Sequence, residues 1–405
     1  MFTWSPIFIN VLARLAEPVF EVELLHETDT GKHPVVSLAL PATPWELLDA
    51  MDALRLSDGD GMIVDIIDYH GFDFLEEHLG SRENLCALNA LAQKLSGWTE
   101  VQREAYCGMV AIEKLGEDYC LPMLINIAYS EDSYNVAYEA VNDEQLGRFY
   151  VDGGFVPETD ELTDEQCELL DYAKIGKKMR TGENGTFTRI GYVVQTEDIE
   201  EVHKGIDLML RRPIYAAIIE AGIMDTGLCT RFWLPASETV LNAAKETLGV
   251  ESWDQVSFRC ADCRIPDLRD AFSTSGNIDE MNTVAQILKS LTDEETRTCK
   301  AVVRAMKVDT LSSAEMVMTS LDDYVASPEF RTFEDVGKAE IDFQIDSETA
   351  QILKRFVSLY DFGKAMAEHD NMILTEYGGI ERRDHQPIQT IGPPSSLAVG
   401  EMEMM

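Results

Sequence analysis

The chain is poor in basic residues. Of its 405 residues, 33 are Lys or Arg and 73 are Asp or Glu, which gives a formal net charge of -40. Such an excess of negative charge repels nucleic acid and attracts basic surfaces, so we expect no direct nucleic-acid binding. The charge is not confined to one tail, because residues 1–200 carry a net -25 and residues 201–405 a net -15. General acidity, as in halophilic or very soluble proteins, is the alternative explanation.

Long apolar runs are also missing. No stretch reaches the roughly 18 apolar residues that a membrane helix requires. The longest, from Ile214 to Ile223, contains Glu220. The first residues show no basic region followed by an apolar run, so we expect neither a signal peptide nor a membrane partner. The 8 cysteines lack the spacing of a small disulfide-rich domain. This scatter is typical of a reducing cytoplasm, where we expect the protein to be.

The common catalytic motifs are absent as well. The sequence has no Gly-Lys-Ser/Thr phosphate loop, no Gly-x-Ser-x-Gly elbow and no His-Glu-x-x-His helix. Its one Cys-x-x-Cys, formed by Cys260 and Cys263, lacks the second pair of a zinc site and is interpreted as two reduced, partly buried thiols. Asp58-Gly-Asp60-Gly begins like a calcium loop, but Tyr69 stands where the bidentate Glu belongs. We therefore expect no catalytic residues, no metal and no cofactor.

What the sequence does contain is a repeat. Leu40-Pro41-Ala42 matches Leu234-Pro235-Ala236, and LCALNALAQKLSGWTE near residue 90 matches DEMNTVAQILKSLTDEE near residue 283. Further matches follow in the same order, ending with Gly176-Lys177 and Gly363-Lys364. The offset between matched residues drifts in one direction only, as loop deletions would produce. We infer a tandem duplication of a unit of roughly 180 residues, far longer than a solenoid repeat.

Each copy has the pattern of an α+β unit. Strand, helix and strand signals come first, with helices expected over Trp45–Leu56 and Glu238–Val250 and a strand after the Asp58–Gly61 turn. A helical block follows, in which Thr99 with Gln102 and Thr292 with Glu295 have the capping-box pattern. A mixed block ends each copy. We expect α/β domains at 1–80 and 201–275, helical domains at 81–135 and 276–325, α+β domains at 136–200 and 326–385, and a disordered tail at 386–405.

The first copy resembles the antirestriction protein ArdA family over about residues 1–195. The run IVDIIDYHGF from Ile63 to Phe72, followed by Asn84-Leu85 and Leu88-Asn89, is similar to one motif of that family. The run LLDYAKIG from Leu169 to Gly176, with later glycines and Gly191-Tyr192, is similar to its closing motif. The second copy keeps Trp233-Leu-Pro235, Asn282, Gly337 and Gly363 but loses both Asp-Tyr pairs, so it is a diverged ArdA-like unit.

The resemblance implies a fold and a function. Members of this family are elongated acidic mimics of DNA, carried by plasmids and conjugative transposons, and each unit has three small domains. Units pair into a curved rod that binds type I restriction-modification enzymes in place of DNA. For this chain the resemblance implies a protein of the bacterial host cytoplasm that binds a type I methyltransferase or endonuclease complex, as a homodimer or as a single-chain pseudo-dimer.

Two groups of carboxylates are the candidate partner-binding residues. The first acidic patch comprises Asp58, Asp60, Asp65, Asp68, Asp73, Glu76, Glu77 and Glu83. The second acidic patch comprises Asp160, Glu161, Asp164, Glu165, Glu168 and Asp171. Duplex DNA carries one negative charge per roughly 1.7 Å of its axis, so a continuous face of carboxylates could occupy a basic DNA-binding groove.

Other functions remain open from the sequence. The same scaffold could inhibit another DNA-binding defence system, such as a CRISPR effector, or bind a DNA-packaging protein. From a different class, acidic pairs near Cys260 and Cys263 could serve a metal-dependent enzyme.

Overall fold

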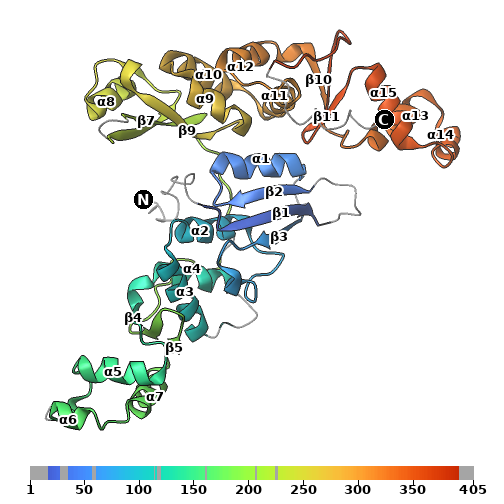
Figure 1. The fold of residues 1–405 in the computed structure, drawn as a ribbon. Coiled ribbons are helices and arrows are strands. Elements are labelled where there is room, and N and C mark those ends of the chain that lie inside the picture. Colours follow the sequence, from blue (N-terminus) through green and yellow to red (C-terminus); the bar gives the residue numbers. More distant parts are fainter. Residues whose placement is uncertain are drawn as a thin grey trace, which may run out of the picture. The chain divides into compact units, whose positions relative to one another are not determined.

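The computed structural model describes residues 17–27, 35–56, 61–113, 115, 120–159, 162–205, 208–223 and 227–391. The fold is α+β, as predicted, and combines helices with four small three-stranded sheets (Figure 1). Within these residues no helix is long and apolar enough to cross a membrane. The Asp58–Gly61 turn falls mostly outside the described part of the chain.

The elements of the first copy follow the predicted order of strands, helical block and mixed block. The strands are β1 Phe20–His26, β2 Val36–Leu40, β3 Met62–Asp68, β4 Tyr134–Tyr138, β5 Thr186–Phe187 and β6 Gly191–Gln195. The helices are α1 Pro44–Leu54, α2 Leu85–Leu95, α3 Glu100–Glu113, α4 Cys120–Tyr129, α5 Asp143–Asp152, α6 Asp164–Cys167 and α7 Tyr172–Glu183.

The second copy repeats this order. Its strands are β7 Ala217–Gly222, β8 Cys229–Leu234, β9 Ser257–Cys263, β10 Tyr324–Ser327, β11 Ile373–Thr375 and β12 Gly378–Arg382. Its helices are α8 Glu238–Leu248, α9 Arg269–Ser275, α10 Ile278–Ser290, α11 Asp293–Met306, α12 Leu311–Thr319, α13 Phe333–Gln344, α14 Ser347–Leu353 and α15 Leu359–His369. Apart from α9, each α-helix and strand has a counterpart in the first copy.

The sheets repeat in topology as well as in order. The sheet β2-β1-β3 recurs as β8-β7-β9, and β4-β6-β5 recurs as β10-β12-β11. The Leu40-Pro41 and Leu234-Pro235 bonds, which precede α1 and α8, are both cis. Helix α1 ends at Leu54 and α8 at Leu248, each two residues before its predicted end, and each is followed by a residue in the left-handed conformation. The repeated order and topology support the inferred duplication.

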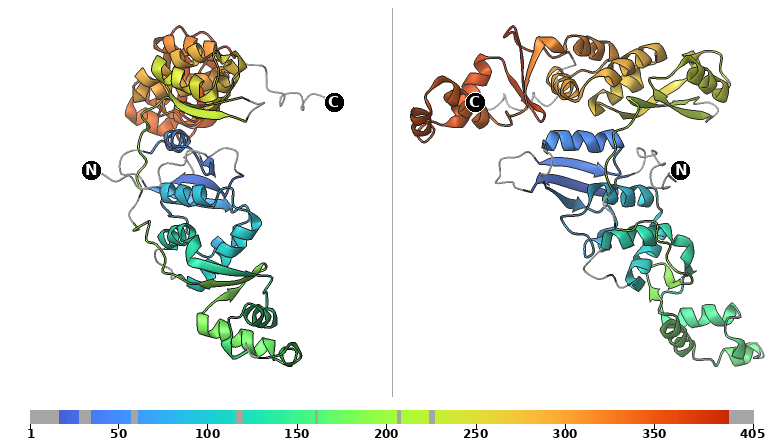
Figure 2. Two further views of the ribbon diagram at one scale, coloured as in Figure 1. Left: turned by 90° about the vertical axis from the view of Figure 1, so that its left-hand side faces the viewer. Right: turned by 180° about the vertical axis from the view of Figure 1, so that it is seen from behind.

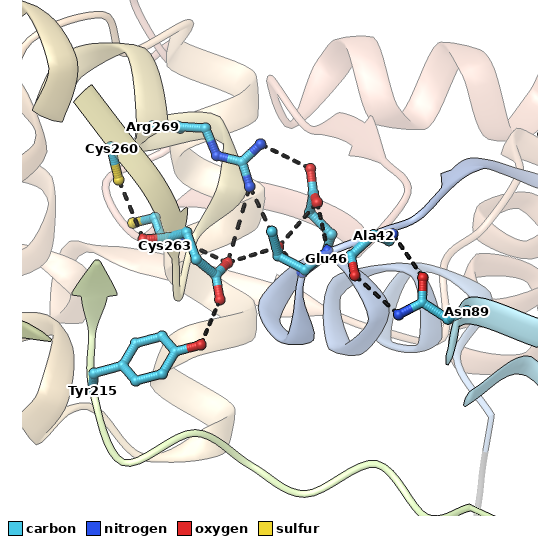
Figure 3. Close-up of polar contacts among 9 residues, drawn as sticks. Ala42, Glu46, Asn89, Tyr215, Cys260, Cys263 and Arg269 are labelled. Carbon is cyan, nitrogen blue, oxygen red and sulfur yellow. Dashed lines mark hydrogen bonds and ion pairs between the residues drawn. The ribbon is translucent and has the colours of Figure 1, made fainter. Parts of the chain in front are cut away.

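One asparagine of the repeated stretch makes the same contact in both copies. Asn89 accepts from the backbone N–H of Ala42 at 2.7 Å and donates to the carbonyl of Ala42 at 3.0 Å. Asn282 does the same with Ala236, at 2.7 and 3.0 Å. Figure 3 shows the first of these pairs. Each asparagine therefore ties its helical block to the segment between a strand and a helix.

Glycines set the packing of the mixed blocks. Helix α5 crosses α7 where Gly147 meets Gly176, and α13 crosses α15 where Gly337 meets Gly363. A Cβ on any of these four glycines would overlap a backbone carbonyl of the facing helix. The matched glycine pairs noted in the sequence are therefore sites of close helix contact.

The chain divides into two compact units, whose bounds differ from those of the predicted copies. Unit 1 contains residues 1–24, 37–42 and 62–209, and unit 2 contains residues 25–36, 43–61 and 210–405. Helix α1, which the sequence places in the first N-terminal domain, thus groups with the second copy. Within each unit a sheet, a helical block and a mixed block follow one another in space (Figure 2).

The predicted disordered tail was assigned too early in the chain. Ile388 is buried in the core of unit 2, and the N–H of Ile391 donates to the carbonyl of Met306 at 2.8 Å. Residues 386–391 are held because this apolar side chain and this backbone group find partners there. Residues 392–405 lie outside the described part.

Candidate partner-binding surface

The first acidic patch begins on strand β3. Val64 is fully buried and its neighbour Asp65 is exposed, because successive side chains of a strand point to opposite faces. Asp68, at the end of the strand, is also exposed and accepts from the N–H of His70 at 2.8 Å. The strand thus directs two carboxylates outward.

The patch continues through the loop after β3. Phe72 and Leu75 are buried and anchor the short 3-10 helix Asp73–Leu75. Asp73, Glu76 and Glu77 are exposed on this anchored segment, and Glu83 is half-buried near its end. The N–H of Val64 donates to the carbonyl of Ser81 at 3.0 Å, which holds the returning loop against β3.

Tyr69 shows that the patch carboxylates act together. Burial raises the pKa of Tyr69, and the charges of Glu76, Asp65 and Glu83 raise the pKa further. These three carboxylates come from a strand, from the loop after it and from the segment before α2. Their combined effect on one phenol indicates that they surround it and share one negative field.

Two basic side chains, His70 and Arg103, lie beside the patch. His70 Nδ1 lies 3.6 Å from Asp68 Oδ1. The Arg103 guanidinium is directed at backbone oxygens instead, at 3.2 Å from the carbonyl of Trp98 and 3.3 Å from that of His70. Its charged plane also lies 5.1 Å from the centre of the Phe72 ring. Arg103 thus helps to position the loop.

The second acidic patch is less uniformly negative than the first. Glu165, Glu168 and Asp171 are exposed around α6, but Asp171 caps α7 by accepting from the N–H of Lys174 at 3.0 Å. Exposed lysines follow on α7, and the neighbouring Leu169 is 85% exposed. The carboxylates are therefore interleaved with cations and an apolar side chain.

Some candidate residues cannot be placed. Asp58, Asp60, Asp160 and Glu161 lie outside the described residues, as does the side chain of Asp164.

In unit 2, the counterpart of Asp68 is not at the surface. Asp262 is fully buried and accepts from the Thr43 hydroxyl at 2.7 Å and from the Tyr215 hydroxyl at 2.8 Å (Figure 3). Burial raises the pKa of Asp262 to about 6, against the opposing effect of those two hydrogen bonds and of Arg269. Thr43 caps helix α1, so this helix covers the carboxylate. A carboxylate so enclosed cannot contact a partner.

Other acids of unit 2 are neutralised by ion pairs. Glu220 is bonded to both Arg231 and Arg259, and Arg304 pairs with Asp267 at 2.7 Å. Exposed carboxylates remain on unit 2, such as Asp270 and Glu294, but the counterpart of Asp68 is not among them.

The Cys-x-x-Cys pair belongs to the core of unit 2. Both thiols are free, and they are more deeply buried than expected, with 3% of Cys260 and none of Cys263 exposed. The pKa of the Cys260 thiol is raised, chiefly by its hydrogen bond with Cys263 and secondly by burial. Across the described residues no group of three or more His, Cys, Asp or Glu side chains is arranged to hold a metal ion.

Comparisons of the chain with protein-family models and with curated protein sequences gave no match. The resemblance to the ArdA family accordingly depends on the residues quoted for it.

Proposed function

We propose that the protein is an antirestriction DNA mimic that inhibits a type I restriction-modification enzyme by occupying its DNA-binding groove. The basic groove would meet the first acidic patch of unit 1 where it normally meets DNA phosphates. No reaction is required of the protein, which acts by occupancy. Blocking this groove would protect incoming mobile DNA from restriction.

The exposed carboxylates of the first acidic patch are the observation that carries this proposal. Asp65, Asp68, Asp73, Glu76 and Glu77 are exposed on one short segment of the chain, and buried Phe72 and Leu75 fix that segment. A preorganised charge array binds more tightly than a flexible one, because less conformational entropy is lost on association. The effect of three patch carboxylates on Tyr69 supports a shared field.

The choice of partner depends on the sequence. Both motifs of the ArdA resemblance lie in the first copy, and the first acidic patch overlaps one of them at Asp65 and Asp68. In the second copy the counterpart of Asp68 is buried. We therefore assign partner binding to unit 1 and a supporting role to unit 2.

The test is inhibition of DNA cleavage and methylation by a purified type I enzyme. The full chain should inhibit both reactions stoichiometrically. The variant D65N/D68N/D73N/E76Q/E77Q removes five exposed charges, and we expect it to weaken inhibition by at least about tenfold, since each close charge pair contributes on the order of 1 kcal/mol.

The matched control removes five exposed charges from unit 2 through E251Q/D270N/E294Q/D309N/D322N. It should inhibit like the unaltered protein. If both variants lost inhibition equally, inhibition would depend on net charge and not on the patch. Failure of the full chain to inhibit would refute the proposed function.

A further inference from the structure

Helix α1 is seated in a groove of unit 2. The walls of this groove are the segment after β9, helix α11 and the turn between β11 and β12. Ala53 of α1 is 5% exposed and belongs to the main apolar cluster of unit 2. Arg55, just after the helix, donates to the carbonyls of Glu376 at 2.8 Å and Thr375 at 3.1 Å. The helix is thereby held along its length.

Opposite charges join this helix to its groove. Lys300 Nζ lies 2.8 Å from Asp49 and 2.6 Å from Asp52, and it is almost fully buried. Arg269 Nη1 lies 2.8 Å from Glu46, and both side chains are buried (Figure 3). Because a buried charge requires a partner, an acidic helix is matched here to a basic groove.

Unit 1 has an open cavity between the elements that correspond to the walls of this groove. Its volume is about 540 Å³. The segment after β3 contributes Gly71, Asp73 and Phe74, helix α3 contributes Glu104, Cys107, Gly108 and Ala111, and the turn between β5 and β6 contributes Thr186 to Arg189. By the repeated order of elements, β3, α3 and the β5–β6 turn are the counterparts of β9, α11 and the β11–β12 turn.

The charged positions of the unit 2 groove are neutral in this cavity. Thr99 begins α3 and Thr292 begins α11, and the same number of residues separates Thr99 from Cys107 and Thr292 from Lys300. Cys107 therefore stands where Lys300 stands. By the same count, Ala111 stands where Arg304 does. A helix that fits the cavity meets no counterpart of Lys300 there.

Helix α8, the counterpart of α1, lacks two of the three acids that join α1 to its groove. Counted from the capping residues Thr43 and Ser237, Val240 stands at the position of Glu46 and Ala243 at that of Asp49. The exposed Glu246 stands at the position of Asp52 and keeps an acid there. Val240 is 43% exposed and Ala243 is exposed, whereas Leu241, Ala244 and Leu248 pack inward. The loss of Asp49 in the helix thus accompanies the loss of Lys300 in the groove.

We propose that the cavity of unit 1 binds helix α8 of a second copy of this chain, through the face that carries Val240 and Ala243. Two observations carry this interaction surface. The equivalent groove of unit 2 holds the equivalent helix, and the loss of Asp49 in α8 accompanies the loss of Lys300 in the cavity. The association does not depend on DNA mimicry, so either could fail without the other.

Disulfide cross-linking tests the contact in the full chain. With A243C, mild oxidation should join the introduced thiol to Cys107 of another chain and give a covalent dimer on a non-reducing gel. The dimer should be absent from A243C/C107S, which keeps the remaining cysteines. The control N242C places a thiol about 100° around the axis of α8 from residue 243 and should not cross-link to Cys107. A disulfide formed only within one chain, or equal cross-linking by N242C, would overturn the proposal.

A charge exchange gives an independent test by sedimentation. The variant A243D should weaken self-association by about tenfold or more, because the cavity has no counterpart of Lys300 to pair with the new carboxylate. The double variant C107K/A243D recreates the Lys300–Asp49 pair and should restore association. A chain that is monomeric at all concentrations, or a double variant no better than A243D, would contradict the proposal.

Discussion

At the scale of single residues, a matched asparagine makes the same contact in both copies, whereas a matched aspartate differs in exposure between them. Asn89 and Asn282 each make a two-bond contact with an alanine after a Leu-Pro pair. An amide suits this contact because it donates and accepts at once. Asp68 and Asp262 also correspond in sequence, but one is exposed and the other is buried. The surroundings, and not the residue type, determine which can contact a partner.

Asp262 should make the stability of unit 2 depend on pH. Its pKa of about 6 in the folded state exceeds the ordinary value of 3.8, so the folded chain binds more protons than the unfolded chain between these values. Its contribution is therefore greatest below about pH 4 and is lost as the pH rises through about 6. From pH 4 to 7, the difference in unfolding free energy between the natural chain and D262N should change by up to about 3 kcal/mol.

Denaturant unfolding at several pH values measures this difference. Tryptophan fluorescence is suitable, because Trp45, Trp233 and Trp253 all belong to unit 2. The control D270N removes an exposed carboxylate of the same unit. A pH-independent difference for D262N would show that the buried carboxylate does not titrate in this range.

At the scale of elements, close helix contact explains the paired glycines. Gly147 and Gly176 allow α5 and α7 to approach, and Gly337 and Gly363 do the same for α13 and α15. Amphipathic patterns locate such helices but do not say how closely they pack. A glycine in a helix interior is unfavourable by about 1 kcal/mol relative to alanine. The close packing of the two helices offsets this cost.

Helix α7 offers a matched pair of substitutions for this packing. In G176A the new methyl group would overlap the carbonyl of Asp143, and we expect a loss of about 1–3 kcal/mol or more in stability. In G182A the methyl group meets no atom within 4 Å. That variant should be neutral or up to about 1 kcal/mol more stable. Thermal unfolding and hydrogen exchange in α5 and α7 would report both effects, and equal behaviour of the two variants would refute the packing explanation.

At the scale of the whole molecule, charge is divided unequally between the copies. Residues 1–200 carry a net -25 and residues 201–405 a net -15. Ion pairs involve acids of both units, such as Asp143 with Arg180 in unit 1 and Glu220 with Arg231 in unit 2. In the first acidic patch, Asp65, Asp73, Glu76 and Glu77 are exposed to a partner.

Inhibition by the full chain should therefore fall steeply with salt. Salt shortens the range of electrostatic attraction, from about 10 Å at 0.1 M to about 3 Å at 1 M. We expect the inhibition constant measured against a type I enzyme to rise at least about tenfold between 0.1 and 0.5 M salt. The binding of DNA phosphates to basic protein sites weakens with salt in the same way. The five-charge variant of the patch should show a shallower dependence. A salt-independent inhibition constant would be incompatible with a mimic of phosphate charge.

Much of the fold could be predicted from the sequence, and less of the candidate site. Strand β3 follows from the alternation of Met62, Val64 and Ile66, and the start of α11 follows from Thr292 and Glu295, since both patterns are local. Exposure of the patch carboxylates was harder to predict. It depends on the burial of Phe72 and Leu75, which anchors the loop. The proximity of Asp65, Glu76 and Glu83 to Tyr69 likewise depends on how this loop folds back.

The sequence by itself determined the α+β class, the duplicated order of elements and the negative charge, because these follow from local periodicity, repeated residues and composition. Only the tertiary structure decided that α1 packs with the second copy, that Asp262 is buried while Asp68 is exposed, and that the unit 1 cavity stays open where unit 2 holds a helix. These features arise from contacts between residues far apart in the chain. Local patterns carry no information about which groove a helix occupies or which carboxylate it covers.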